Sequence, residues 1–173
     1  MANYVIGMPQ SPLLRELRQT KPFPSNREEA FVSILRTADM LRWRIAEVLE
    51  PEGITLAQFN VLRILRGARD TGLPTLEIAA RMVEQAPGIT RLLDRLELAG
   101  LVRRERPRAD RRQVVCHIEK KGLAILARLD TTVPQASEVL FAGLSTAEID
   151  PLIRSLDAIR SACAARCTSL RKQ

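Results

Sequence analysis

The stretch GLVRRERPRADRRQVVCHIEKKG, residues Gly100 to Gly122, carries more information than any other part of the chain. It predicts two short strands, Leu101–Arg106 and Arg111–Ile118, joined by a turn at Pro107–Asp110. Eight of its residues are Lys or Arg and three are acidic, which gives a net charge of +5 out of +7 for the whole chain. Double-stranded DNA carries about one negative charge per 1.7 Å of its axis. A hairpin this basic therefore predicts contact with DNA.

The composition is that of a helical protein with one core. The 173 residues are 46% hydrophobic but only 3% aromatic, so we expect a core of Leu, Ile, Val and Ala. The net charge of +7 favours an acidic partner, with nucleic acid ahead of an anionic membrane surface. No apolar run approaches the roughly 20 residues of a spanning helix, and no signal peptide is apparent. We expect a cytoplasmic protein without a membrane partner, whose three cysteines are reduced.

Capping residues and helical periodicity predict helices on both sides of the hairpin. Ser25, Thr55 and Ser145 are each followed three residues later by Glu or Gln, the capping-box pattern of a helix start. Gly100 is suited to the left-handed cap that ends a helix. The expected helices are Pro12–Arg18, Ser25–Glu50, Thr55–Gly67, Thr75–Val83, Ala86 or Pro87 to Ala99, Lys120–Leu140 and Ser145–Leu170, with a loop at Ala68–Pro74.

Three consecutive helices and a hairpin are the order of a winged helix-turn-helix. We therefore predict a mainly α fold of the α+β class, with long flanking helices that form a helical dimerisation region. Residues 1–24 are expected to be an N-terminal arm, residues 25–54 and 120–173 the dimerisation region, and residues 55–119 the DNA-binding region of one intertwined domain. The last helix supports a homodimer, because its apolar stripe of Ile149, Leu152, Ile153, Leu156, Ile159, Cys163, Cys167 and Leu170 is more than one chain can cover.

The helix before the hairpin has the pattern of a recognition helix. Its residues Ile89, Leu92, Leu93 and Leu96 share one face, which we expect to be buried. On the opposite face, Arg91 is suited to guanine O6 and N7, and the methyl group of Thr90 to thymine. Gly88 leaves room for a phosphate at the helix start. The alternative is a solvated face with ordinary Arg–Asp pairs.

These motifs resemble those of the MarR-type transcriptional regulators. The family's wing motif, D-x-R-x3-[VI]-x-[L]-T-x-x-G, appears here at Asp110, Arg112, Cys116, Ile118, Glu119 and Gly122. The segment Ile89–Arg104 is similar to the family's recognition helix and first wing strand, and Thr55–Leu65 is similar to its second helix. The resemblance extends from about Ile34 to Leu170. Cys116 replaces the usual branched aliphatic residue, and Glu119 replaces the usual threonine.

The resemblance implies a homodimer on double-stranded DNA, with the recognition helix in the major groove and Arg112 in a minor groove. Asp110 then orients the wing, and Arg108 and Arg111 hold phosphates. Twofold symmetry predicts a pseudo-palindromic operator with half-sites about 34 Å apart. The expected DNA-binding residues are Gln85, Pro87, Gly88, Thr90, Arg91, Arg95, Arg108, Arg111 and Arg112.

The family also implies a pocket for a small aromatic or phenolic effector between the dimer helices and the winged lobe. The residues expected to line it are Arg42, Trp43, Ala46, Phe59 and Leu62, with Arg42 as the counter-ion of a carboxylate. The alternative interpretation places Trp43 and Phe59 in the core and makes Arg42 a surface charge.

No catalytic or metal-binding pattern is present in the sequence. His117 is the only histidine and directly follows Cys116, so the two side chains point to opposite faces of a strand and form no dyad. We expect His117 to be a half-exposed wing residue or a phosphate contact. The sequence contains neither a phosphate loop nor a zinc-binding cysteine spacing, so we expect no enzyme, cofactor or metal site. Cys116, Cys163 and Cys167 are interpreted as structural thiols.

Taken together, the sequence predicts a sequence-specific, homodimeric DNA-binding regulator that acts as a repressor. Two alternatives stay open. One is an architectural protein that binds DNA with little regard for sequence. The other is a regulator that responds to oxidants through its thiols.

Overall fold

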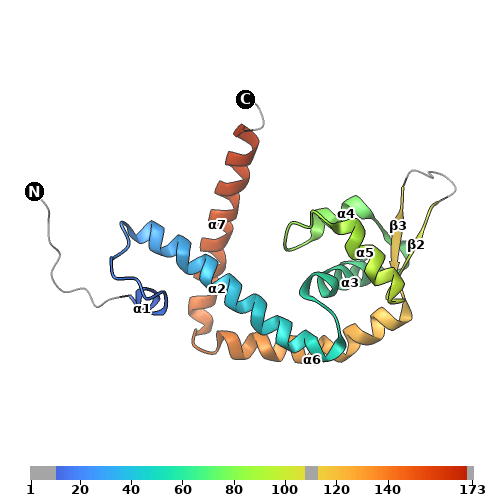
Figure 1. Cartoon of the computed structure of the whole chain (residues 1–173), viewed down its shortest axis with the longest axis horizontal. Coiled ribbons are helices and arrows are strands. Elements are labelled where there is room, and N and C mark those ends of the chain that lie inside the picture. The colour runs from blue at the N-terminus through green and yellow to red at the C-terminus, as the bar shows by residue number, and fades with distance from the viewer. Residues whose placement is uncertain (1–10, 108–112, 171–173) are drawn as a thin grey trace, which may run out of the picture.

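The computed structural model describes residues 11–107 and 113–170, with side chains through Ala165. The molecule is elongated (Figure 1). A winged lobe forms one end and long helices form the other. The short N-terminal helix lies at the end far from the lobe, and the last helix projects away from the other long helices. None of the helices in the described part of the chain is long and apolar enough to cross a membrane.

Four helices form the described part of the molecule outside the lobe. They are α1 (Pro12–Glu16), α2 (Asn26–Leu49), α6 (Lys120–Phe141) and α7 (Thr146–Leu170). α2 packs against α6, and both also contact the first helix of the winged lobe, so they connect the lobe to the rest of the molecule. Buried leucines at positions 13 and 14 are the anchor of α1.

The winged lobe contains three helices and a small antiparallel sheet. Its helices are α3 (Leu56–Ala68), α4 (Thr75–Arg81) and α5 (Ile89–Leu98). Its strands are β1 (Leu73–Pro74), β2 (Val102–Glu105) and β3 (Val115–Ile118), in the order β1-β3-β2. Single 3-10 turns, η1 (Glu50–Glu52) and η2 (Arg69–Thr71), follow α2 and α3. The predicted fold class is confirmed.

One core joins the lobe to the long helices. Leu62 and Leu65 of α3, Ile78 of α4 and Leu93 and Leu96 of α5 have no exposed surface. The core continues through Cys116 of β3 into α6, where Ile125, Leu126 and Leu129 are buried. Because each such leucine removed from water contributes about 1.5–3 kcal/mol, this shared core fixes the position of α5 on the lobe.

The three predicted capping boxes differ in how completely they form. At Thr55 both halves are present, with Gln58 N donating to Thr55 Oγ1 and Thr55 N donating to Gln58 Oε1. At Ser25 the hydroxyl oxygen accepts from Glu28 N at 3.2 Å. At Ser145 the Glu148 carboxylate accepts from both the backbone N–H and the hydroxyl. The hydrogen bonds from Ser145 hold the pKa of Glu148 below its ordinary value of 4.5.

Several predicted boundaries were wrong. The predicted recognition helix begins at Ile89 rather than at Ala86 or Pro87, because the chain turns at Pro87 and Gly88 is non-helical at φ −112° and ψ 30°. The helix before it ends at Arg81 rather than Val83, since Met82 is extended at φ −64° and ψ 139°.

The sheet also differs from the prediction. Part of the expected loop at 68–74 is strand β1, which pairs Leu73 with Cys116. The first hairpin strand is shorter than expected, and residues 113–114 lie outside the second. Two-residue strands leave no periodic pattern in a sequence, so only their pairing partner reveals them.

Candidate nucleic-acid interface

The recognition helix α5 is held by one face and presents the other to solvent. Leu93 and Leu96 are fully buried, and Ile89 and Leu92 pack partly against the same core. Thr90, Arg91 and Arg95 lie on the opposite side and are exposed. Neither Arg91 nor Arg95 is paired with a carboxylate among the described residues. Their guanidinium donors are therefore available to a partner.

The Arg–Asp pairs that would occupy this face are absent from the described structure. Asp94 is the acidic residue between the two arginines, and its carboxylate pairs instead with Arg104 of β2, Nη2 to Oδ1 at 2.7 Å. In the described structure, Asp94 therefore does not neutralise Arg91 or Arg95 on the outward face of α5.

The start of α5 is open. Gln85, Pro87 and Gly88, which precede the helix, are exposed. Gly88 is the N-cap residue, no side chain caps the helix, and a Cβ atom at Gly88 would meet nothing within 4 Å. Backbone N–H groups of a first helical turn attract an anion, and here no side chain blocks the approach.

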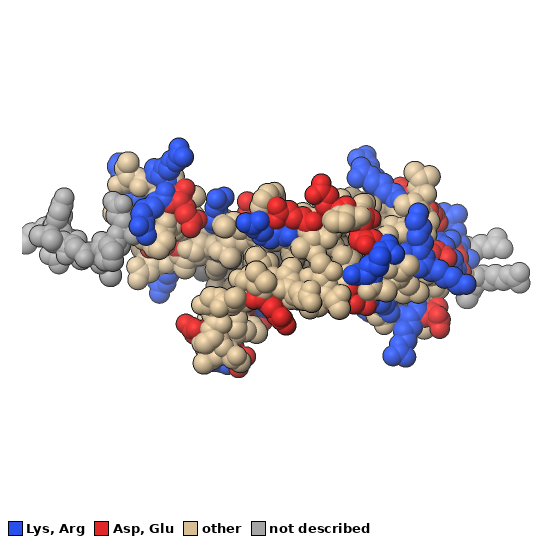
Figure 2. All heavy atoms as spheres, turned by 90° about the horizontal axis from the view of Figure 1, so that it is seen from below, with Lys and Arg blue, Asp and Glu red and all other residues tan. Residues whose placement is uncertain are grey.

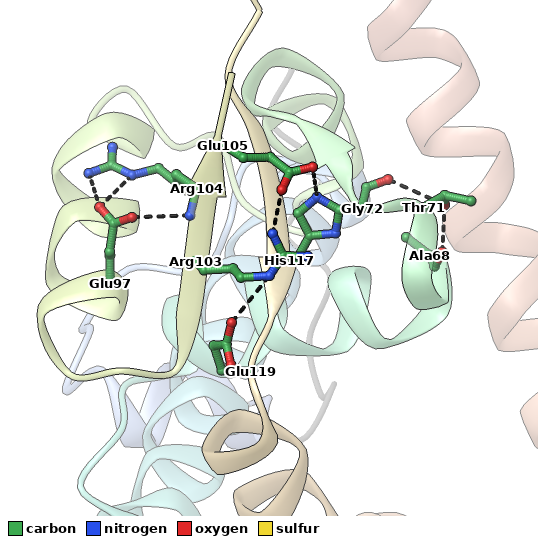
Figure 3. A network of polar contacts seen from close by, with 9 residues as sticks. All are labelled: Ala68, Thr71, Gly72, Glu97, Arg103, Arg104, Glu105, His117 and Glu119. Atoms are coloured by element: carbon green, nitrogen blue, oxygen red, sulfur yellow. Dashed lines mark hydrogen bonds and ion pairs between the residues drawn. The ribbon is translucent and has the colours of Figure 1, made fainter. Parts of the chain in front are cut away.

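The two adjacent arginines of β2 point to opposite sides of the strand and pair with different carboxylates (Figure 3). Arg103 pairs with Glu105 and with Glu119, the latter at 3.3 Å. Arg104 turns toward α5, where its Nε donates to Glu97 Oε2 at 2.8 Å. These hydrogen bonds from Arg104 lower the pKa of Glu97 below its ordinary value of 4.5. Two of the eight basic residues of the stretch Gly100 to Gly122 thus bind carboxylates of the protein itself.

His117 is buried, so the expectation of a half-exposed wing residue was wrong. It is 7% exposed, and its Nε2 lies 3.0 Å from Glu105 Oε1 across the β2–β3 pair. Its ring lies over Gly72, which has a φ of +63° and where a Cβ atom would come within 2.6 Å of the ring. Because Gly72 has no side chain, its backbone can lie against the His117 ring and cover it.

The wing tip carries four residues expected to act on DNA, namely Arg108, Asp110, Arg111 and Arg112. They lie outside the described residues, as residues 108–112 are not described. Their predicted roles stay predictions. Arg106, next to the tip, is exposed.

The charge of the molecule is unevenly distributed. Figure 2 shows Lys and Arg side chains gathered at the winged end and a second group at the opposite end, with Asp and Glu side chains among uncharged residues between them. The expected DNA-facing residues of α5 belong to the winged end. The positive potential of such an end attracts a polyanion and raises its concentration near the surface of the winged lobe.

A cavity of about 690 Å³ lies between α2, α3, α6 and the segment that joins α4 to α5. Its apolar lining includes Ile45, Leu92 and Val133, and its polar lining includes Asn60 and Arg63. Residues 81–86 and Gly88 form one side, so the cavity adjoins the start of the recognition helix.

Only Phe59 of the five residues predicted for an effector pocket lines this cavity. Leu62 is fully buried in the core, and Trp43 and Ala46 are exposed on α2. Arg42 pairs with Glu84, which does line the cavity. The reason is helical phase: successive residues of a helix are rotated by about 100°, so Ile45 faces the cavity and its neighbours do not.

Two of the described arginines line the cavity: Arg81, which pairs with Glu77, and Arg63, which the sequence patterns did not identify as a cavity residue. The Arg63 guanidinium carbon lies 5.6 Å from the centroid of the Phe59 ring, and no carboxylate pairs with it within the described part of the chain. The spacing of Phe59 and Arg63, four residues apart on a predicted helix, was the available signal.

The two described cysteines differ in exposure. Cys116 is fully buried, and this burial raises the pKa of its thiol above the ordinary value of 9.0. Cys163, interpreted as a structural thiol on the apolar stripe of the last helix, is exposed in the single chain. The side chain of Cys167 lies outside the described residues.

Large apolar side chains are exposed along the helices outside the lobe. Phe31 is 62% exposed, Trp43 59% and Val139 75%. Ile153 and Ile159 of α7 are exposed at 50% and 46%. Large apolar side chains exposed in this number on a few helices are typical of an interaction site.

Comparison with known proteins identifies relatives along most of the chain. A family model described as the MarR family matches residues 54–114. A crystal structure of a MarR transcription factor from Planctomyces limnophilus has 36% sequence identity and a TM-score of 0.61, over 79% of this chain and 98% of that one.

Two curated relatives agree with this assignment. The regulatory protein proposed for the hcr operon of Thauera aromatica is 30% identical over 59% of this chain and 60% of its own length. The HTH-type transcriptional regulator TtmR of Methylorubrum extorquens is 28% identical over 72% of this chain and 63% of its own length. The matches thus span less than two thirds of these two proteins. The relatives are transcriptional regulators and not enzymes.

Proposed function

The chain belongs to the MarR family of DNA-binding transcriptional regulators, and from this we propose that it is a cytoplasmic, homodimeric repressor released from its operator by a small aromatic anion. One observation carries the proposal. Arg91 and Arg95 are exposed on the outward face of α5 without a carboxylate partner among the described residues, while Leu93 and Leu96 anchor the helix to the core.

The outward face of α5 is suited to the major groove, which is about 12 Å wide and admits one helix. In the proposed complex, Arg91 binds guanine O6 and N7, Thr90 contacts a thymine methyl group, and Arg95 positions the helix on the duplex. Gln85, Pro87 and the open helix start at Gly88 lie beside the phosphates.

The wing supplies the second set of proposed contacts. Arg112 enters an A·T-rich minor groove, whose narrow walls enhance its negative potential. Arg108 and Arg111 hold phosphates, and Asp110 orients the wing. The family resemblance and the local positive charge support these roles.

The exposed apolar side chains of α2, α6 and α7 support a homodimer. A twofold interface buries the same patch of both copies, so the side chains exposed in one chain become covered by the other. Two winged lobes then face one side of a duplex, with half-sites about 34 Å apart. Repression is steric, because the bound dimer covers promoter DNA that polymerase needs.

The cavity beside α5 supports the effector part of the proposal. An aromatic ring fits its apolar lining, and an attached carboxylate fits the unpaired guanidinium of Arg63. Arg63 thereby takes the counter-ion role that the sequence analysis gave to Arg42. Because the segment before α5 lines one side of the cavity, an occupant contacts the element that places the recognition helix.

Selection of bound fragments from the organism's genomic DNA, followed by footprinting, tests the proposal. A regulator protects an inverted repeat with half-sites one helical turn apart. Uniform protection of every fragment supports the architectural alternative and contradicts the proposed function.

A further inference from the structure

Arg104 has a different environment from every other described arginine of the hairpin. Its side chain is 24% exposed, compared with 50% for the adjacent Arg103. It lies at the register position paired with Cys116, and its guanidinium extends from β2 to the side of α5 (Figure 3). The Arg104 side chain therefore forms part of the contact between the first wing strand and the recognition helix.

Four bonds make this contact. The Arg104 guanidinium donates to Glu97 Oε2 from Nε at 2.8 Å and also from Nη2. Its Nη2 lies 2.7 Å from Asp94 Oδ1, and its backbone N–H donates to Glu97 Oε1 at 3.0 Å. Both acidic residues belong to α5, and Glu97 accepts through both of its oxygens, a geometry that resists rotation of the side chain.

The basic residues of this region fall into two groups, those that pair with carboxylates of the protein and those that do not. Arg91 and Arg95 have no carboxylate partner among the described residues, whereas Arg104 uses three guanidinium contacts on the protein's own carboxylates. A phosphate that recruited Arg104 would have to break these bonds and leave Glu97 and Asp94 unpaired beside a polyanion.

We infer that Arg104 is a positioning residue, which locks Glu97 and Asp94 of the recognition helix to the first wing strand so that helix and wing approach the duplex at one fixed angle. The inference rests on the proposed function, since it concerns the binding of one duplex in two grooves. Without the lock, the shared core still holds α5 and the hairpin together, but their angle varies more in the free protein and is narrowed only on binding, at a cost in affinity for the correct site.

The change in DNA affinity when Glu97 loses its charge tests the inference. If Glu97 were only a carboxylate near DNA, its removal would strengthen binding to every duplex, because a repulsive charge is lost. If Glu97 is part of the lock, its removal weakens binding to the selected site. The two explanations therefore predict opposite signs for the variant Glu97→Gln.

The experiment measures the affinity of wild type and Glu97→Gln for a duplex selected from genomic fragments by the wild-type protein, and for an unselected duplex of equal length. Circular dichroism first establishes a temperature at which every variant is fully folded. We expect about tenfold weaker binding of Glu97→Gln to the selected duplex, unchanged binding to the other, and an unchanged salt dependence. The matched control is Glu77→Gln, which loses the same charge but whose partner Arg81 lies on the same helix.

A double-variant cycle completes the test. Arg104→Gln alone, and Arg104→Gln with Glu97→Gln, are expected to bind the selected duplex about as weakly as Glu97→Gln alone. Additive losses, a salt slope lower by about one in Arg104→Gln, or tighter binding by Glu97→Gln contradicts the lock. If the wild-type protein selects no duplex, the proposed function and this inference both fail; if it selects one and the variants bind it like wild type, the inference alone fails.

Discussion

At the scale of single residues, the partners of each arginine separate those that stabilise the protein from those that are free to bind a ligand. Arg66 pairs with Asp130, Arg103 with Glu105 and Arg128 with Glu52. Arg91 and Arg95 have no such partner within the described chain. A guanidinium held by a carboxylate has few donors left, so the unpaired arginines are the ones to test on DNA.

The first prediction concerns Arg91. Replacement by alanine removes a bidentate contact to guanine, so we expect the affinity for the selected duplex to fall by about 1–3 kcal/mol and the sequence preference at one base pair to relax. Competition binding with single-base variants of the duplex measures both effects. The control is Arg66→Ala, which removes an arginine whose partner lies on α6. Equal losses for both variants would show that total charge, and not base recognition, explains the result.

The second prediction concerns Arg63 in the cavity. Benzoate, an aromatic carboxylate, is expected to raise the melting temperature of the wild-type protein in proportion to its occupancy. Arg63→Gln removes the cation and should abolish the shift, while the neutral analogue benzamide should produce little shift in either protein. An equal benzoate shift in wild type and Arg63→Gln would contradict a role for Arg63 as counter-ion.

At the scale of elements, ion pairs join segments that are distant in the sequence. Glu52 follows α2 in η1, and both of its carboxylate oxygens accept from Arg128 of α6 at 2.8 and 3.0 Å. This contact fixes the start of the winged lobe against the long helix that leaves it. The side-chain hydrogen bond from Arg128 lowers the pKa of Glu52 from its ordinary value of 4.5.

The third prediction follows from the direction of this pKa shift. Because the pKa of Glu52 is lower in the folded than in the unfolded chain, the stabilisation is present above the unfolded pKa and is lost as the pH falls through the folded pKa. Glu52→Gln should therefore melt below wild type at neutral pH, and the difference should shrink as the pH falls below about 4.5. Thermal melts from pH 7 to pH 3 measure it, with the neighbouring Glu50→Gln as the control for charge. A difference that stays constant to pH 3 would be evidence against the ion pair.

The fourth prediction concerns the wing. If Arg112 neutralises a phosphate or lies in the minor groove, Arg112→Ala should weaken operator binding and reduce the slope of log affinity against log salt by about one unit. This result is the opposite of that expected for Arg104→Gln, whose slope should not change. An unchanged slope in Arg112→Ala would remove Arg112 from the set of DNA contacts.

Local patterns in the sequence predicted most of the elements but not all of their contacts. Helix starts were readable because a capping residue such as Thr55 acts within one turn, and the buried face of α5 because its leucines are periodic. Strand β1 was missed because it exists only through its pairing with β3. The role of Arg104 was missed because a charge count treats every arginine alike, although strand alternation already placed Arg103 and Arg104 on opposite sides.

The residues that line the cavity are harder to predict from the sequence than the helices and strands, because the lining depends on how these pack together. The lining combines α2, α3 and α6 with the segment before α5, and no local pattern states how these elements pack. The orientation of α2 about its axis decides that Ile45 lines the cavity and Arg42, three residues earlier, does not. The family resemblance predicted a pocket in this region, and only the packed structure identifies Arg63 as its unpaired cation.

At the scale of the whole molecule, the winged end and the long helices present different surfaces. The basic winged end holds the open start of α5, while Phe31, Trp43 and Ile153 are exposed along α2 and α7. A single chain leaves this apolar surface in water, and a second copy is the simplest partner that covers it. A homodimer of this kind presents two winged lobes together to one duplex.

The mass of the protein–DNA complex tests this arrangement most directly. Analytical ultracentrifugation of the wild-type protein with a selected duplex that holds one inverted repeat should give a complex of two chains per duplex at saturation. The free protein at the same concentration should sediment as a dimer. One chain per duplex, or a mass that keeps rising with added protein until the duplex is coated, would contradict the account.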